Sequence, residues 1–262
     1  SVATFLLEVG TEELPADFAR LVNPQLEKLV GRDLTQRRLS YETIKCTSTP
    51  RRIVLIVEGL ADSARDSEKE HKGPPASQAF DNGSPTKAAL GFAKRFDIDP
   101  YALEVRETPK GPFVFAKVLE YGADTHDLLG EMIPDWIGNL QGSRFMRWGV
   151  DERRFSRPIR WLVALLDKSL IQVSLKGTDP EISSGSVSRG HRLFNNEVYV
   201  SSAVNFAAAL KQAGVLVDRH ERKSLIRDLI ETAAKEVKAT PDLSDDLLNE
   251  LTDLVEFPFL IR

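Results

Sequence analysis

Six arginines and only two acids lie in the stretch 144–160, with Phe145, Trp148 and Phe155 set among them. The chain as a whole carries a formal net charge of -4, so this is a local excess of positive charge. A guanidinium makes planar, bidentate contacts to phosphate and also stacks on bases and aromatic rings. Arginines interleaved with aromatic residues are therefore typical of a surface that contacts folded or single-stranded RNA. The alternative is a solvated loop whose arginines pair with acids elsewhere.

Two other groups of residues could carry acid–base chemistry. Glu12-Glu13 could form a general acid and base, although adjacent carboxylates more often begin a helix, where they suit the helix dipole. His191 would need a carboxylate or serine partner in a pocket. Its neighbours Arg189 and Arg192 place the imidazole in a positive field that disfavours protonation, which favours a hydrogen-bonded turn residue or an RNA-facing group. A stand-alone hydrolase using Glu12, Glu13 or His191 remains the alternative function.

The motifs of nucleotide and metal chemistry are missing from the sequence. No two of the sixteen glycines are separated by a single residue, and there is neither a P-loop nor a dinucleotide fingerprint. The four histidines are scattered without metal-ligand spacing. His126-Asp127 is a dipeptide found in metal phosphohydrolases, but that chemistry needs further His and Asp ligands, and His126 sits at a helix start. We expect this chain to hold no metal and no cofactor.

The composition is that of a globular protein, with 42% apolar and 28% charged residues. No apolar run approaches the ~18 residues of a membrane span, and no secretory signal precedes the first strand. Cys46 is the only cysteine, which fits a reducing compartment. We therefore expect a cytoplasmic protein in which Cys46 is a packed strand residue.

Hydrophobic periodicity predicts an α+β fold in several lobes. A strand at 4–9, a helix from Ala16 and strands at 41–46 and 52–58 form the first unit. The polar stretch 61–83 is broken by glycine and proline and is interpreted as a linker or excursion loop. The expected division is an N-terminal unit 1–60, a second α+β lobe 61–200 and a helical segment 201–262.

Later segments refine this division. Ser84-Pro85 is expected to cap a helix. The apolar run 158–166 reads as a strand, in which side chains alternate between two faces, so Arg160 is expected to face solvent if Ile159 and Trp161 face a core. The chain ends on the apolar segment 256–262, which favours a fragment of a longer protein.

Seven short motifs occur in one order along nearly the whole chain. They are Glu8-Val9-Gly10-Thr11-Glu12-Glu13-Leu14-Pro15, Thr49-Pro50-Arg51-Arg52, Lys72-Gly73-Pro74, Pro85-Thr86-Lys87-Ala88-Ala89-Leu90-Gly91-Phe92, Met146-Arg147-Trp148-Gly149, Phe155-Ser156-Arg157-Pro158-Ile159-Arg160-Trp161 and Arg189-Gly190-His191-Arg192. In this order they resemble the β subunit of the bacterial heterotetrameric glycyl-tRNA synthetase. One departure is Leu193, which precedes Phe194 where that family usually has phenylalanine directly after the last motif.

The resemblance implies an α2β2 enzyme that joins glycine to tRNA(Gly) with ATP. It places the class II catalytic core and the ATP site on the α subunit, and it assigns tRNA binding and assembly to the β subunit. Two further C-terminal domains of the family, a His-Asp-type domain and an anticodon-binding domain, would follow residue 262. The region 155–194 also looks similar to the editing-type domain of the phenylalanyl-tRNA synthetase β subunit, from which no editing activity is inferred.

The basic residues in or near these motifs become candidates for contact with tRNA. They are Arg51, Arg52, Lys87, Arg144, Arg147, Arg153, Arg154, Arg157, Arg160, Arg189 and Arg192. Some of the same arginines could instead form the interface with the α subunit.

Overall fold

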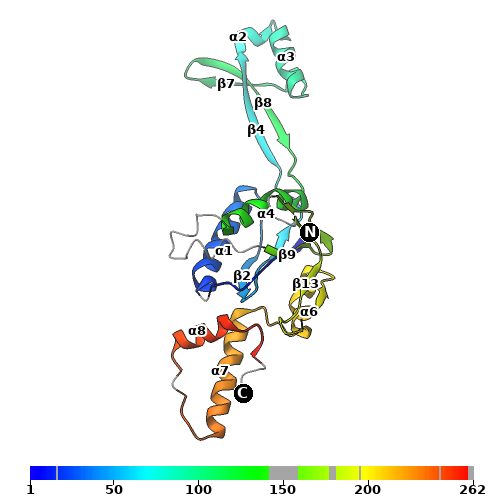
Figure 1. Cartoon of the computed structure of the whole chain (residues 1–262). Helices are drawn as coiled ribbons and strands as arrows, with labels where there is room; N and C mark the ends of the chain where they lie inside the picture. The colour runs from blue at the N-terminus through cyan, green and yellow to red at the C-terminus, as the bar shows by residue number, and fades with distance from the viewer. Residues whose placement is uncertain (16, 142–158, 177–180, 195, 242, 259–262) are drawn as a thin grey trace. The chain divides into compact units, whose positions relative to one another are not determined.

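The computed structural model describes residues 1–15, 17–141, 159–176, 181–194, 196–241 and 243–258. Contacts divide the chain into two compact units. Unit 1 comprises Ser1–Ser63 and Asp124–Arg262, and unit 2 comprises Ala64–Ala123. Both units combine helices with antiparallel strands, so the expected α+β class is confirmed (Figure 1).

Unit 1 is built on a five-stranded antiparallel sheet with the strand order β10-β9-β1-β3-β2. Its strands are β1 (Val2–Thr11), β2 (Thr43–Thr49), β3 (Arg52–Ala61), β9 (Ile159–Leu166) and β10 (Ser169–Leu170). The central strand β1 is apolar and buried along most of its length, as expected of a strand with a neighbour on each side. The register aligns Gly10 of β1 with Arg52 on β3 and with Trp161 on β9.

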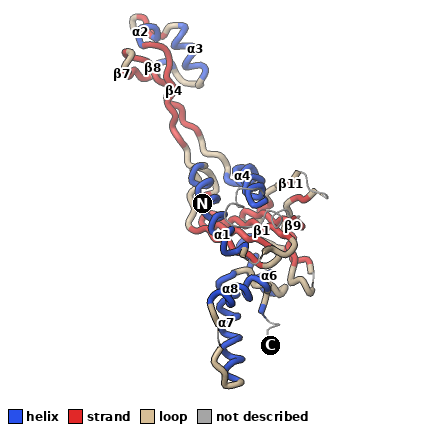
Figure 2. Tube along the Cα trace, turned by 60° about the vertical axis from the view of Figure 1, so that its left-hand side comes forward, coloured by secondary structure: helices blue, strands red, loops and turns tan. Residues whose placement is uncertain are grey.

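Helices α1 (Phe18–Gln36) and α4 (Thr125–Gln141) pack against one face of this sheet (Figure 2). The rings of Phe5 and Trp136 lie 6.2 Å apart. Trp136 Nε1 donates a hydrogen bond of 2.8 Å to Asp33 Oδ2, which joins the two helices. Cys46 of β2 is buried on this side and its Sγ lies 3.6 Å from Asn23 Oδ1, so its assignment as a packed strand residue is confirmed.

A β-hairpin and a short helix cover the other face of the sheet. These elements are β13 (Val187–Arg189), β14 (Glu197–Tyr199), the 3-10 turn η3 (Ala203–Asn205) and α6 (Phe206–Gln212), with the short strands β11 (Ser174–Leu175) and β12 (Ile182–Ser183) before them. Phe206 and Leu210 of α6 are fully buried against Leu6, Val54 and Val163 of the sheet. Alternation along β1 and β3 puts Glu8 and Arg52 on this same face, so the apolar layer has a polar end.

Helices α7 (Arg219–Glu236) and α8 (Asp245–Leu254) complete unit 1 and lie side by side (Figure 1). Asp218 and Ser244 cap them by accepting a backbone N–H at the third helical position. Arg222 of α7 is fully buried and donates to the carbonyl oxygens of Thr252 at 3.0 Å, Leu216 at 2.8 Å and Ser48 at 2.8 Å. One guanidinium therefore ties α7 to α8 and to the end of β2.

Unit 2 has a three-stranded sheet in the order β4-β8-β7, with two helices packed on it. Its elements are β4 (Ser67–Pro75), α2 (Ala76–Ala79), β5 (Phe80–Asp81), β6 (Ser84–Pro85), α3 (Lys87–Arg95), η1 (Pro100–Ala102), β7 (Glu104–Thr108) and β8 (Gly111–Glu120). Small residues such as Ala89, Ala93 and Ala116 let the helices approach the sheet closely. Gly73 does the same, because a Cβ there would come within 2.5 Å of the Phe92 ring.

Three expectations about this organisation are wrong. Strand β9 pairs with β1, so 61–200 is not one lobe and the N-terminal unit does not end at residue 60. The stretch 61–83 is not a linker, because β4 and α2 occupy most of it. Thr86, not Ser84, caps α3 by accepting from Ala89 N at 3.4 Å, whereas Ser84 pairs with Asp81 in a small hairpin.

Candidate nucleic-acid interface

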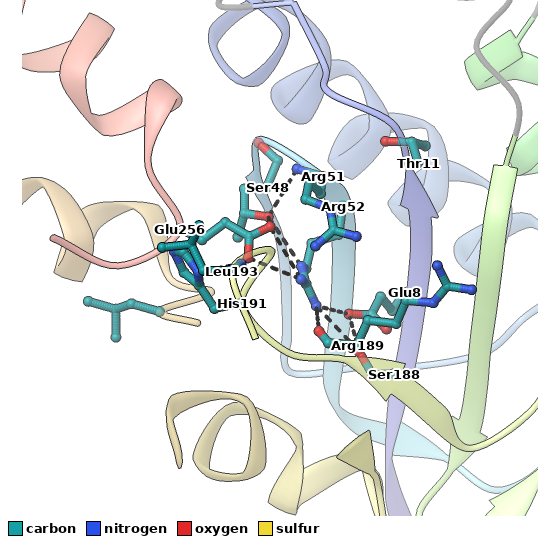
Figure 3. Close-up of polar contacts among 12 residues, drawn as sticks. Glu8, Thr11, Ser48, Arg51, Arg52, Ser188, Arg189, His191, Leu193 and Glu256 are labelled. Carbon is teal, nitrogen blue, oxygen red and sulfur yellow. Dashed lines mark hydrogen bonds and ion pairs between the residues drawn. The ribbon is translucent and has the colours of Figure 1, made fainter. Parts of the chain in front are cut away.

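Arg52 is the most highly connected side chain at the polar end of the unit 1 sheet (Figure 3). Its Nη1 donates to Glu8 Oε2 at 3.1 Å and to the Arg189 carbonyl at 2.7 Å. Its Nη2 donates to both carboxylate oxygens of Glu256 at 3.3 Å, and its Nε donates to Thr49 Oγ1 at 3.2 Å. The side chain has no exposed surface, so its expected role in contacting tRNA is wrong: burial and two carboxylates leave no donor for a phosphate.

Glu8 links this hub to Trp161. One carboxylate oxygen accepts from Arg52 and from Ser188 Oγ at 2.9 Å, and the other accepts from Trp161 Nε1 at 2.7 Å. All four groups are buried, and each finds a partner, as buried polar groups must. The network fixes the plane of the indole against the sheet.

Three guanidinium groups lie near the ring of Trp161. The distances from Cζ to the ring centroid are 5.1 Å for Arg189, 5.3 Å for Arg52 and 5.6 Å for Arg51. Cations within about 6 Å of an indole are attracted by its quadrupole. Arg51, Arg52, Arg189 and Arg192 together form the arginine cluster.

The charges within the arginine cluster are not all compensated. Arg52 forms buried ion pairs with Glu8 and Glu256, and Arg192 forms an exposed ion pair with Glu13. Arg51 and Arg189 form no ion pair with a described residue. Arg51 Nη1 is buried and has no hydrogen-bond partner among the described residues. Burial lowers the pKa of this guanidinium, the Glu256 carboxylate opposes the shift, and Arg52, Arg189 and Arg192 lower the pKa further. The surplus positive charge of the cluster therefore lies on Arg51 and Arg189.

Arg160 lies on strand β9 and faces solvent, while Ile159 and Trp161 are buried, as the alternation predicted. It forms an ion pair with Glu12, and both side chains are about half exposed. An exposed pair of this kind contributes little to stability, which leaves the guanidinium available for exchange to another anion.

His191 lies beside the cluster and is largely buried. Its Nδ1 accepts a hydrogen bond of 3.1 Å from Leu193 N, and Phe194 N donates to the His191 carbonyl at 2.9 Å, which closes the turn after Arg192. Burial lowers the pKa of His191, the Glu256 carboxylate opposes the shift, and the nearby Arg51 lowers the pKa further. The expected turn role therefore agrees with the structure, with burial as the larger cause of the shift. Leu193 remains exposed and Phe194 packs on the imidazole at 5.7 Å.

A pocket of about 300 Å³ opens beside the cluster. Arg51, His191 and Arg192 line it, and so do Leu254 at the end of α8 and Phe257 just after it. Leu193 and the carboxylates of Glu13 and Glu256 also line it. The pocket thus combines hydrogen-bond donors, Arg51 among them, with apolar surface.

The remaining candidates are distributed as follows. Lys87 is exposed at the start of α3 in unit 2. Five candidates from the stretch 144–160 lie outside the described residues: Arg144, Arg147, Arg153, Arg154 and Arg157. The aromatic residues of that stretch also lie outside them: Phe145, Trp148 and Phe155. Within the described residues no three His, Cys, Asp or Glu side chains gather as a metal site would require. No helix in that same part of the chain is both long and apolar enough to cross a membrane.

Sequence reasoning missed the two carboxylates of the network, Glu8 and Glu256. A signal for Glu8 exists, because it is the only charged residue in the apolar run 4–9, and a lone charge in a buried strand needs a partner. Glu256 gives no such signal, since its pairing with Arg52 joins segments 204 residues apart.

A family model places the sequence of this chain among the subunits of aminoacyl-tRNA synthetases. The family model described as glycyl-tRNA synthetase beta subunit matches residues 5–262. The chain is 44% identical over 258 residues to the glycine–tRNA ligase beta subunit of Acaryochloris marina, covering 98% of this chain and 36% of that protein. It is 42% identical over 261 residues to the protein of that name from Trichodesmium erythraeum, covering 99% of this chain and 36% of the relative.

The corresponding protein of Natranaerobius thermophilus is 39% identical over 257 residues, with 97% of this chain and 36% of the relative covered. The chain therefore belongs to the glycyl-tRNA synthetase beta subunit family. It spans about a third of the length of these relatives.

Proposed function

We propose that this chain is the tRNA-binding and assembly part of a glycine–tRNA ligase β subunit. The observation that carries the proposal is the surplus charge of the arginine cluster: Arg51 and Arg189 lie on one indole without a carboxylate partner among the described residues. Phosphate is the anion of tRNA, and arginine is the side chain best shaped to bind it. The relatives that share 39–44% identity are named as beta subunits of glycine–tRNA ligase.

The proposed reaction of the whole enzyme joins ATP, glycine and tRNA(Gly) to give glycyl-tRNA, AMP and diphosphate. The aminoacylation site and the ATP belong to a partner α subunit, and this chain supplies no cofactor site. The exposed Arg160 serves either the tRNA or the α subunit. The same role is proposed for the arginines at 144–157, which lie outside the described residues. The reaction places the protein in the cytoplasm, where tRNA is charged.

The hydrolase alternative finds no support in the geometry. Glu12 and Glu13 each form an ion pair with an arginine, Arg160 and Arg192, and both pairs are exposed rather than buried. His191 uses Nδ1 to accept from the backbone of Leu193. The likeness of 155–194 to the editing-type domain of the phenylalanyl-tRNA synthetase β subunit stays a proposal about fold, with no editing reaction attached.

The division of labour can be tested with the full-length β subunit and the α subunit purified separately. Glycine-dependent exchange between ATP and pyrophosphate should occur with the α subunit present and be absent with this chain alone. Binding of tRNA(Gly) should require the β subunit. Exchange driven by this chain alone, or tRNA binding that is indifferent to the β subunit, contradicts the proposal.

A further inference from the structure

The pocket beside the arginine cluster offers the two kinds of surface that a nucleotide binds, one cationic and one apolar. A nucleotide has an anionic phosphate at one end and a flat, largely apolar base face at the other. Arg51 and Arg192 stand on the polar side of the pocket, and Leu193 and Leu254 expose apolar surface, at 63% of each residue's full exposure. Its volume of about 300 Å³ lies at the lower end of pockets that hold small ligands.

Arg51 is the residue that points to an anion. Its Nη1 is buried and lacks a hydrogen-bond partner among the described residues, although buried donors are almost always paired. The nearby carboxylates are engaged elsewhere: Glu256 accepts from Arg52, and Glu13 pairs with Arg192. A third acceptor, supplied from outside the described residues, would satisfy this donor and offset the surplus charge.

We propose that this pocket binds one unpaired nucleotide of an RNA strand, with its phosphate on Arg51 and its base against Leu193 and Leu254. The inference rests on the proposed tRNA-binding function and adds a location and a ligand class to it. A single stranded or flipped-out nucleotide is required, because a base inside a duplex presents its edge rather than its face.

The first test uses the α2β2 enzyme and a tRNA(Gly) transcript, with affinity measured across a salt series. Arg51→Ala should weaken binding about tenfold or more, as expected for a hydrogen bond to a charged group. It should also flatten the dependence of log affinity on log salt by about 0.7–0.9. Arg51→Lys keeps the charge and should keep the salt slope while losing part of the affinity. Arg32→Ala, an exposed arginine of α1 paired with Asp33, is the matched control and should change neither quantity.

A second variant separates the base wall from the phosphate contact. Leu193→Ala removes an exposed side chain, so it should leave the fold unchanged while weakening tRNA binding several-fold at an unaltered salt slope. If Arg51→Ala and Leu193→Ala both bind tRNA like the parent enzyme, the pocket is not a nucleotide site, although the proposed function stands. If the parent enzyme does not bind tRNA(Gly), the proposed function itself fails.

A chemical-modification experiment tests the same proposal without a substitution, so it holds even if Arg51→Ala disturbs folding. Modification of arginines by phenylglyoxal, mapped by mass spectrometry in the full-length β subunit, should slow at Arg51 when uridine 5′-monophosphate is added, and stay constant at Arg32. Uridine and inorganic phosphate, each alone, should protect Arg51 less. Equal protection by inorganic phosphate would reduce the site to a simple anion site and overturn the assignment of a nucleotide. Unchanged modification of Arg51 with all three probes would overturn it as well.

Discussion

Trp161 lies directly over Gly10 of the neighbouring strand, so closely that a Cβ at Gly10 would come within 1.9 Å of the indole Cδ2. Glycine is therefore the one residue that lets the ring lie on the sheet. The ring in turn holds Arg51 and Arg189 at its surface. Gly10 thus belongs to the arginine cluster although it has no side chain.

Gly10→Ala should displace Trp161 and destabilise the chain by about 3 kcal/mol, the upper part of the usual range for overpacking a core. Urea denaturation followed by tryptophan fluorescence would measure both effects. Gly138→Ala is the matched control, because nothing lies within 4 Å of a Cβ at that exposed position of α4. The control should gain stability by up to about 1 kcal/mol through helix propensity. Equal stability of Gly10→Ala and the parent chain would show that the ring can move at no cost.

Arg52→Met should destabilise the chain by about 3–5 kcal/mol, because it leaves the carboxylates of Glu8 and Glu256 buried without a counter-ion. Adding Glu8→Gln to this variant should restore part of the loss by removing one buried charge. Arg37→Ala breaks the exposed pair with Glu131 and should cost at most about 1 kcal/mol. Chemical denaturation of the four proteins checks the order, and a loss in Arg52→Met no larger than that in Arg37→Ala would refute the role of the hub.

Arg222→Met should loosen α7 and α8 before the sheet unfolds. The substitution leaves the carbonyls of Ser48, Leu216 and Thr252 without their donor, at about 1–3 kcal/mol for each group that water does not reach. Limited proteolysis should then cut within 237–244, between the helices, faster than in the parent chain. Hydrogen exchange in β1 should stay slow, since local opening does not expose the central strand. Cleavage rates like those of the parent chain would contradict this.

Cys46 should react slowly with iodoacetamide in the native chain, because burial raises the pKa of its thiol and the nearby Glu27 carboxylate raises it further. The only cysteine of the chain makes the assay specific. The pKa of the folded thiol lies above its ordinary value, so the contribution of this thiol to stability is fully present below the ordinary pKa and is lost as the pH rises above it. Cys46→Ala should show a flatter fall of stability in alkaline solution. Fast alkylation of the native chain would contradict the buried thiol.

Arg160→Ala in the α2β2 enzyme should flatten the salt dependence of tRNA binding by somewhat under one unit, with little change in melting temperature. Its pair with Glu12 is half exposed, so the fold loses little. Glu12→Gln frees the same guanidinium and should strengthen tRNA binding slightly at low salt. A fall in melting temperature with an unmoved salt slope would make Arg160 structural. The companion positions Arg147 and Arg157 stay predictions of the same kind, outside the described residues.

Alternation along a strand predicted the local part of this site but not its long-range part. The exposed side of Arg160 follows from its buried neighbours Ile159 and Trp161. The burial of Arg52 could have followed from the same rule, because it shares a face with Val54 in a strand that is apolar on both faces. Arg51 and Arg52 look alike in sequence, and the ion pairs of Arg52 with Glu8 and Glu256, 44 and 204 residues away, separate their roles.

For the fold too, the sequence predicted local elements but not the pairing of distant strands. Local patterns predicted the strand at 4–9 and the strand at 52–58, which are parts of β1 and β3. The pairing of β1 with β9 could not be predicted in this way, because no local signal marks which distant strand joins a sheet edge. The change in composition at 61–83 marks the start of unit 2, but nothing in it shows that the chain returns to the first sheet.

The chain leaves unit 1 after Ser63 and returns to it at Asp124, and these two residues are neighbours. Ser63 and Asp124 form an antiparallel bridge, and Thr125 N donates to the Asp62 carbonyl at 3.1 Å. Within unit 2 the ends are likewise joined, by Ala64 N donating to the Ala123 carbonyl at 2.9 Å. The conformational entropy lost on closing this long excursion is thus offset by the folding of unit 2 itself. For the main sheet, the intervening sequence is equivalent to a tight turn, so a change in its length would leave the register of β3 and the start of α4 fixed.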